Sequence, residues 1–155
     1  MPGLETVLGL PRTEPDPLDG YLVDEQVGFL LRRAQQRHAA IFQAGMAEAD
    51  LTPRQFTALI KIVELGRITQ NHLGRLAAMD PATIQGVVRR LIARGLVHRA
   101  PDPADRRTAV LAPTPSGLAL AAHSVARARD ITEATLAPLA PEERRRFLSL
   151  LHKLI

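Results

Sequence analysis

The chain has 155 residues, 46% of them hydrophobic and 3% aromatic, which suits one packed core or a small domain joined to a helical region. It contains no Cys, and this excludes disulfides, thiolate metal sites and cysteine nucleophiles. No apolar run approaches the roughly 18 residues of a membrane span, and the N-terminus does not read as a signal peptide. We therefore expect a soluble, cytoplasmic protein without membrane contact.

The net charge of +4 is unevenly distributed along the chain. Residues 1–26 contain six acidic residues against one Arg, whereas residues 67–107 contain eight Arg against three Asp. A polyanion is therefore expected to bind the middle of the chain. Of the 20 basic residues, 18 are Arg, which favours forked contacts to phosphate and guanine, although genomic base composition has the same effect.

The N-terminal part of the chain divides into an arm and a helix. Residues 1–20 include four Pro and are expected to form a flexible or extended arm. From Tyr21 to about Ala47, apolar positions recur every three or four residues, which predicts a long amphipathic helix. Its stripe consists of Val23, Val27, Leu30, Ala34, His38 and Ile41.

Three short helices are predicted next. Thr52-Pro53 combines an N-cap residue with Pro at the first helical position, and the helix that it opens ends at Gly66. Thr69 caps a third helix, and Asp80-Pro81 opens a fourth that ends at Gly95. The second helix is expected to bury Phe56, Leu59, Ile60 and Val63, and the fourth to bury Ile84, Val87, Val88 and Leu91. The third and fourth helices, joined by a short turn, form a helix-turn-helix unit.

After Gly95 the helical period ends. Residues 96–99 and 108–111 are strand candidates on either side of a charged, turn-rich stretch, which predicts a β-hairpin with a basic tip, or wing. Thr114-Pro115 caps a fifth helix, and Pro141 with two following Glu residues starts a sixth. The sixth carries Phe147, Leu148, Leu151, Leu154 and Ile155.

The predicted fold is mainly α with a small β-hairpin wing: a winged helix-turn-helix with N- and C-terminal dimerisation helices. We expect an arm at 1–20, a DNA-binding domain at 51–113, and a helical dimerisation region at 21–50 and 114–155. The terminal helices carry apolar stripes without a core to cover, and such helices usually pack on a second copy of the chain. A homodimer is therefore expected.

The outward face of the fourth helix is predicted to read double-stranded DNA. Small residues such as Gly86 let the helix sit deep in the major groove, Gln85 can pair with adenine, and Arg89 can fork to guanine. Thr83 flanks them, and the neighbouring residues placed for phosphate contacts are Asn71, His72, Arg75, Arg90 and Arg94. The alternative is an ordinary solvated helix face.

The wing tip offers a second contact to DNA. Arg106 and Arg107 can enter the narrow minor groove, and Asp105 would hold a neighbouring guanidinium in place. Taken alone, this stretch is equally typical of a solvated turn.

Other kinds of function have little support. The five His residues include no pair at ligand spacing within one helix, so no metal or cofactor is expected. Three Ser residues, Ser116, Ser124 and Ser149, have no recognisable catalytic partner and no phosphate loop is present, which argues against an enzyme. A non-specific architectural or RNA-binding protein is the remaining rival. Residues 67–107 contain no stacking aromatic, which favours duplex DNA over RNA.

Three stretches together resemble the MarR family of bacterial transcription regulators: LTPRQFTAL at 51–59, NHLGRLAAMDPATIQGVVRRLIARGLV at 71–97 and DRRTAVLAPTPSG at 105–117. The last is similar to the family's wing motif through Asp105, Arg107, Thr114 and Gly117, whereas Pro113 stands where Leu is usual. This departure concerns the end of the second wing strand. The resemblance implies a dimer formed by the first, fifth and sixth helices, a pseudo-palindromic operator, and ligand sites between dimerisation and reading domains.

Within that family, DEQVGFLLRRAQQRHAAIF at 24–42 and QNHLGRLAAMD at 70–80 resemble regulators of the breakdown of nicotinate and related aromatic acids. This implies a repressor released by a small aromatic carboxylate, which needs an apolar slot with one or two cationic or hydrogen-bonding groups. The candidate ligand residues are Arg33, Arg37, His38, Phe42, Phe56 and Ile60. The alternative role for His38 is a core histidine bonded within the dimer interface.

Overall fold

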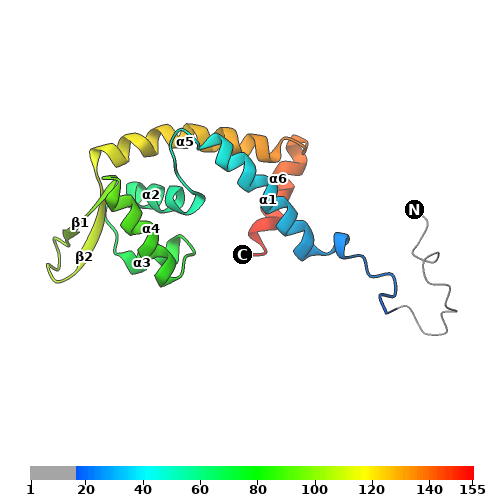
Figure 1. The fold of residues 1–155 in the computed structure, drawn as a ribbon, viewed down its shortest axis with the longest axis horizontal. Helices are drawn as coiled ribbons and strands as arrows, with labels where there is room; N and C mark the ends of the chain where they lie inside the picture. The colour runs from blue at the N-terminus through cyan, green and yellow to red at the C-terminus, as the bar shows by residue number, and fades with distance from the viewer. Residues whose placement is uncertain (1–16) are drawn as a thin grey trace. The chain divides into compact units, whose positions relative to one another are not determined.

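A computed structural model describes residues 17–155 of the chain (Figure 1). Residues 1–16, most of the predicted arm, lie outside the described part. The chain divides into two units, Met1–Gln35 and Gln36–Ile155. Each unit is described by itself.

In the first unit, the predicted long helix begins later than its apolar stripe indicated. A 3-10 turn, Val23–Glu25, comes first, and helix α1, Val27–Gly45, starts after it and continues into the second unit. Gln26 separates the two because its backbone is extended and its side-chain amide donates to the carbonyl of Leu22 at 2.9 Å. The expected start at Tyr21 was therefore wrong by six residues.

The second unit contains the remaining elements in the predicted order. Figure 1 shows a helix-turn-helix, a two-stranded hairpin and two C-terminal helices, and this confirms the mainly α winged fold. The elements are α2 (Pro53–Leu65), α3 (Gln70–Leu76), α4 (Pro81–Ala93), β1 (Val97–Pro101), β2 (Ala109–Pro113), α5 (Pro115–Leu136) and α6 (Pro141–His152).

Polar caps fix where the helices begin, as predicted. The side-chain oxygens of Thr52, Thr69, Asp80 and Thr114 each accept a hydrogen bond from the backbone N–H three residues later. These bonds satisfy backbone donors that have no partner within the helix. The two predicted glycine stops, Gly66 and Gly95, both have positive φ, of 71° and 70°, which favours glycine.

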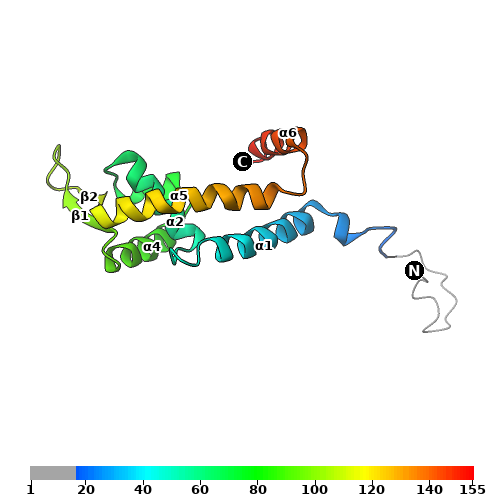
Figure 2. The same ribbon diagram turned by 90° about the horizontal axis from the view of Figure 1, so that it is seen from above.

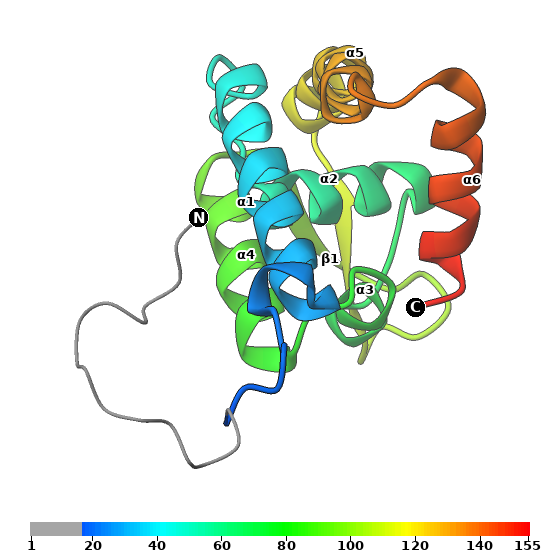
Figure 3. The same cartoon turned by 90° about the vertical axis from the view of Figure 1, so that its right-hand side faces the viewer.

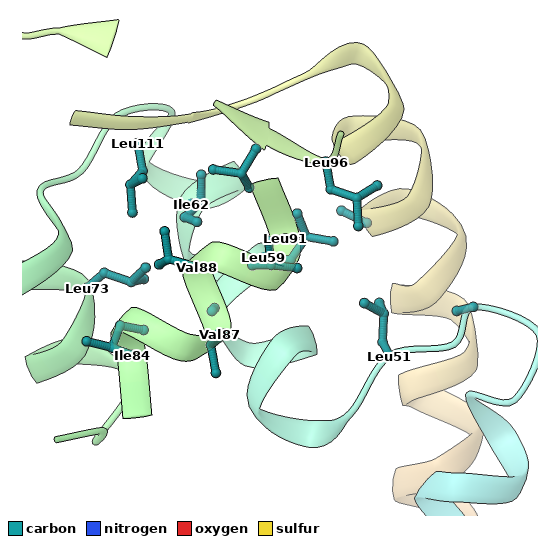
Figure 4. Packing of buried hydrophobic residues seen from close by; sticks show 14 of the residues in the cluster. Leu51, Leu59, Ile62, Leu73, Ile84, Val87, Val88, Leu91, Leu96 and Leu111 are labelled. Carbon is teal, nitrogen blue, oxygen red and sulfur yellow. The ribbon is translucent and has the colours of Figure 1, made fainter. Parts of the chain in front are cut away.

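The core lies between α2, α3, α4 and the hairpin. In Figure 4, Leu59 and Ile62 of α2 face Val88 and Leu91 of α4, with Leu111 above them. All four residues predicted as the inner stripe of α4 are buried. These apolar contacts are the main stabilising interaction of the second unit.

For α2, the predicted buried stripe needs a correction. Leu59 is buried, but Phe56, Ile60 and Val63 are half-buried, and Ile62 and Ala58 take the innermost places. Helix α2 packs on α4 and on α5, so its innermost face is rotated from the face that the sequence indicated. The half-buried face remains partly accessible.

The hairpin strands are antiparallel and end later than predicted. Pairing runs from Val97 with Pro113 to Pro101 with Ala109, and Ile68 adds a bridge to Leu111. Strand β2 thus reaches Pro113, where a residue without an N–H is tolerated because it lies at the strand end.

The junction between hairpin and α5 explains the glycine of the wing motif. A Cβ at Gly117 would lie 2.0 Å from the carbonyl oxygen of Leu96, which leaves no room for any other residue. The same carbonyl accepts the N–H of Thr114 at 3.0 Å, and the Thr114 hydroxyl donates to the carbonyl of Gly95 at 2.6 Å. Gly117 therefore allows α5 to start directly against the end of α4.

Helices α1 and α5 are in contact within the second unit, and the two ribbons lie next to one another in Figure 2. Gly45 of α1 faces Ile131 of α5, whose side chain lies 2.6 Å from where a Cβ would be. Figure 3 shows α6 leaving the end of α5 in a different direction, and Arg144 of α6 pairs with Glu133 of α5 at 2.7 Å.

The apolar side chains of α6 are exposed on this single chain. Helix α6 contains no buried residue, and Phe147, Leu148 and Leu150 are all exposed. Leu154 and Ile155 lie beyond its end at His152. Between residues 17 and 155, no helix has both the length and the apolar character that crossing a membrane requires.

Candidate nucleic-acid interface and ligand site

The turn between α3 and α4 is tight because small groups meet there. The N–H of Met79 donates to the carbonyl of Gly74 at 2.9 Å, and Ala78 between them has a left-handed φ of 51°. A Cβ at Gly74 would lie 3.3 Å from Cγ2 of Ile84, closer than most real Cβ contacts. Glycine thus lets the two helices of the motif approach one another.

Asp80 fixes the first turn of α4. Its carboxylate accepts the Thr83 hydroxyl at 2.6 Å and the Thr83 N–H at 2.9 Å. The hydroxyl bond, followed by the backbone bond, lowers the pKa of Asp80 from its ordinary value. The predicted DNA residue Thr83 is consequently half-buried, and its hydroxyl hydrogen is directed to Asp80.

The outward face of α4 is accessible in the part of the chain that the structure describes. Gln85, Arg89 and Arg90 are exposed, opposite the buried stripe, and a Cβ at Gly86 would meet nothing within 4 Å. The structure therefore brings these predicted residues onto one accessible helix face. A major groove of DNA admits an α-helix presented in this way.

The predicted contacts on α3 are accessible as well: Asn71, His72 and Arg75 are all exposed. The helix start is tied to the hairpin because the Arg99 guanidinium donates to Oε1 of Gln70 at 2.6 Å. Within the part of the chain that the structure describes, Arg75, Arg89 and Arg90 have no ion-pair partner. Their positive charge is therefore uncompensated.

At the wing tip, Asp105 has a different role from the predicted one. Its carboxylate accepts the N–H of Arg107 at 3.0 Å and the hydroxyl of Thr108 at 3.1 Å, so it shapes the turn instead of holding a guanidinium. The guanidinium groups of Arg106 and Arg107 have no partner among residues 17–155 and are exposed. Both remain available to a polyanion.

Arg94 departs most from its predicted place. It is the C-cap residue of α4, and its guanidinium donates to the carbonyl of Asp50 at 2.6 Å and to that of Ala49 at 3.0 Å. Its fork is thus bound to the turn that follows α1, although Arg94 itself is exposed. This arrangement argues against the expected phosphate contact.

Two predicted ligand residues on α1 are bonded to the end of α5. Arg37 donates to the carbonyls of Thr135 at 2.6 Å and Ala134 at 3.0 Å, and Nδ1 of His38 lies 2.9 Å from the Thr135 hydroxyl. That hydroxyl donates its hydrogen to the carbonyl of Ile131, so it accepts from His38, whose Nδ1 carries the proton. His38 is bonded within its own chain.

The predicted aromatic residues form a series. The ring of Phe42 lies 6.3 Å from that of His38 and 5.9 Å, edge to face, from that of Phe56. Ile60 is half-buried against the same core. Arg33 belongs to the first unit, where its guanidinium lies 6.0 Å from the ring of Phe29.

Phe56 borders a hollow of about 290 Å³ on α5 that sequence reasoning missed. Val125 and Ala128 add apolar surface, and Arg129 and Thr132 add a guanidinium and a hydroxyl. Glu133 also borders the hollow, but its carboxylate is paired with Arg144. An apolar wall beside one unpaired cation suits an aromatic carboxylate. The signal available in the sequence was the spacing of these residues on one face of α5.

Among the described residues, no group of three or more His, Asp or Glu is placed to hold a metal ion.

Comparisons with known proteins decide the family. The model of the MarR family matches residues 51–109. The HTH-type transcriptional repressor NicR of Pseudomonas putida is 45% identical over 141 residues, which cover 90% of this chain and 89% of that protein. The chain belongs to the MarR family. This MarR-family protein is accordingly a DNA-binding transcription regulator.

Solved structures agree with this assignment. A probable transcriptional regulator from Pseudomonas aeruginosa is 46% identical with a TM-score of 0.83, covering 86% of this MarR-family chain and 100% of its own. BpsR of Bordetella bronchiseptica is 42% identical with a TM-score of 0.81, covering 86% and 96%. That structure concerns the regulation of DNA binding of BpsR by 6-hydroxynicotinic acid. The resemblance to nicotinate-related regulators is thereby confirmed.

Proposed function

We propose that this MarR-family protein is a repressor that binds a pseudo-palindromic operator as a homodimer and is released by a small aromatic carboxylate of the hydroxynicotinate class. The observation that carries the DNA-binding part is the accessible face of α4, where Gln85 and Arg89 are exposed and a Cβ at Gly86 would meet nothing within 4 Å. The similarity to BpsR, whose DNA binding is regulated by 6-hydroxynicotinic acid, supports the choice of effector.

On DNA, Gln85 and Arg89 contact base edges, with Gly86 and Thr83 beside them. The residues assigned to phosphate are Asn71, His72, Arg75 and Arg90. Arg106 and Arg107 enter the adjacent minor groove, on a turn that Asp105 holds in shape. Residues 51–113 form the DNA-binding domain in this proposal.

The homodimer is formed by the helices outside that domain, within residues 21–50 and 114–155. Exposed apolar side chains on α6, among them Phe147 and Leu148, support this assignment because a second copy would remove them from water. The first unit also exposes large apolar side chains, including Tyr21, Val27 and Leu30. A two-fold dimer places its recognition helices about 34–36 Å apart, one turn of DNA.

The effector binds at the hollow on α5. Its carboxylate pairs with Arg129, its ring packs against Phe56, and Thr132 offers a hydrogen bond. Phe42 and His38 continue the aromatic series from Phe56 toward the end of α5, and Ile60 supports it from the core. Arg33 and Arg37 stay ligand candidates on the sequence resemblance alone, outside this hollow. The protein acts in this proposal through binding alone, without catalysis.

The test uses a duplex selected from a random pool by the protein itself. At one salt concentration, we expect the selected duplex to bind at least about 1,000-fold more tightly than random duplex. Adding 6-hydroxynicotinic acid should release the selected duplex and produce heat in calorimetry. Equal affinity for both duplexes would replace the repressor with a non-specific architectural protein. If neither this acid nor benzoate releases the duplex or produces heat, the proposed effector class is wrong.

A further inference from the structure

Two Arg side chains in the second unit make the same kind of contact, in which one guanidinium donates to two consecutive backbone carbonyls. Arg94 of α4 donates to the consecutive carbonyls of Ala49 and Asp50, at 3.0 and 2.6 Å. Arg37 of α1 donates to the consecutive carbonyls of Ala134 and Thr135, at 3.0 and 2.6 Å. In the Arg37 pair, the two-pronged guanidinium meets the C-terminal end of α5, and in the Arg94 pair it meets the turn that follows α1.

The physical basis of this contact is the end of a helix. The last carbonyls of a helix have no partner within it and carry partial negative charge. A guanidinium offers two parallel N–H groups to neighbouring acceptors, whereas the ammonium of Lys is a point charge. Each fork therefore fixes both the distance and the orientation between two helices.

The Arg94 fork joins the recognition helix to the turn that follows α1. Asp50 has a left-handed φ of 50°, and its N–H donates to the carbonyl of Met46 at 2.9 Å, so the last turn after α1 is closed on itself. Arg94 is the C-cap of α4 and binds the carbonyl of this same Asp50. The end of α4 thus takes its position from α1.

The Arg37 fork joins the same α1 to α5. The His38 contact to Thr135 lies beside it, and Gly45 further along α1 faces Ile131 without room for a Cβ. Glu48, still further along, pairs with Arg127 of α5 at 3.3 Å. From Arg37 to Asp50, α1 and its last turn are therefore attached to α5 along their length and to α4 at their end.

We propose that Arg94 is a positioning residue of the recognition helix, and that the forks of Arg94 and Arg37 connect this helix through α1 to α5. The proposal rests on the proposed function, since α5 carries the effector hollow. Thr132, in that hollow, lies within one helical turn of the carbonyls that Arg37 binds. Arg94 then sets how well α4 fits its operator without contacting DNA.

The first test separates positioning from phosphate contact by salt dependence. Arg94→Gln should lower the preference for selected over random duplex about tenfold and leave the slope of log affinity against log salt unchanged. The matched control is Arg90→Gln, one turn earlier on α4, which should reduce the slope by about 0.9 per subunit with the preference kept. A reduced slope in Arg94→Gln would overturn the proposal in favour of a phosphate contact.

A second readout, the melting temperature, and a second variant, Arg94→Lys, distinguish positioning by Arg94 from a general effect on stability. If Arg94→Gln lowers the melting temperature but keeps the duplex preference of the folded protein, the proposal fails. Arg94→Lys, which keeps the charge but not the fork, should lie between wild type and Arg94→Gln in preference. Should Arg94→Gln not fold, Arg94→Lys carries the same comparison.

The connection through α1 is tested by combining the two forks. Arg37→Gln should also lower the duplex preference, and the double variant should lose less than the product of the two single losses, because either break releases α1. A fully multiplicative double variant would overturn the connection. The wild-type preference for the selected duplex is measured in the same experiment, so a failure of the proposed function is recognised separately from a failure of the forks.

Discussion

Residues 51–113 and helix α6 differ in how they treat apolar side chains. In the former, the apolar residues of α2, α3, α4 and the hairpin converge on one core, and Leu59, Leu91 and Leu111 are fully buried. In α6 no residue is buried, although Phe147, Leu148 and Leu150 lie within four positions. The first region buries its core side chains within itself, whereas the apolar side chains of α6 need a partner to cover them.

The largest expected effect tests the boundary of the self-contained region, where α5 begins against Leu96. Gly117→Ala should destabilise the fold by about 3 kcal/mol, because its Cβ would lie 2.0 Å from the Leu96 carbonyl and the backbone must move. Gly86→Ala is the matched control, also in a helix but in open space, and should stabilise the fold by about 0.5–1 kcal/mol. Denaturant unfolding measures both. Equal effects of the two substitutions would mean that the junction at Gly117 is looser than described.

The next effect tests the dependent region. Phe147→Glu should raise the dissociation constant of the homodimer at least about tenfold, since burial of a Phe side chain is worth about 1.5–3 kcal/mol. Ser149→Glu, in the same helix, provides the control for added charge. Sedimentation equilibrium measures the constant. A Phe147→Glu protein that dimerises as tightly as Ser149→Glu would remove α6 from the proposed interface.

The same contrast governs how much could be predicted from the sequence. Within 51–113, the caps at Thr52, Thr69 and Asp80 and the inner stripe of α4 were all correct, because each depends on residues near in sequence. The start of α1 was not correct, because a local bond from Gln26 to Leu22 interrupts the helix while the apolar stripe continues through it. The buried face of α2 was not correct either, because the packing of α2 against both α4 and α5 decides it.

The predicted site residues differ in the same respect. Exposure of Gln85 and Arg89 follows from the helical period, so their placement was accessible to sequence reasoning. The fork of Arg94, in contrast, joins residues 44 or 45 positions apart, and no pattern in the neighbouring sequence indicates it. The hollow beside Arg129 likewise needs α2 and α5 to be placed together.

A smaller effect divides roles within the proposed DNA-binding surface. Arg89→Ala should relax base preference by about 1–3 kcal/mol, because a forked contact to guanine is lost. Arg75→Ala should instead weaken selected and random duplexes alike. Competition binding with singly altered duplexes makes the distinction. If both substitutions change both duplexes equally, α4 does not read sequence in the proposed manner.

If the effector binds at the hollow on α5, loss of the Arg129 charge should change the affinity for the effector by about tenfold. Arg129→Gln should weaken the binding of 6-hydroxynicotinic acid by that factor, which corresponds to about 1.4 kcal/mol for a solvated charge-assisted bond. Arg127→Gln is the control, since Arg127 lies on the same helix but pairs with Glu48. Titration calorimetry reports both affinities. Equal binding by the two variants would place the carboxylate elsewhere.

The smallest effect concerns the cap that opens α4. Bonds from Thr83 lower the pKa of Asp80 in the folded protein, so its carboxylate adds stability above the unfolded pKa of about 3.9 and loses it as pH falls through the lower folded value. Asp80→Asn keeps one acceptor but cannot titrate. Wild type should therefore exceed Asp80→Asn in stability by a constant margin above about pH 5, and the margin should narrow in acid. Denaturant unfolding at several pH values checks this, with Thr83→Ala as the variant in which the narrowing should be reduced. A margin independent of pH would mean that α4 is capped by the neutral group equally well, and that the order of this region comes from its core alone.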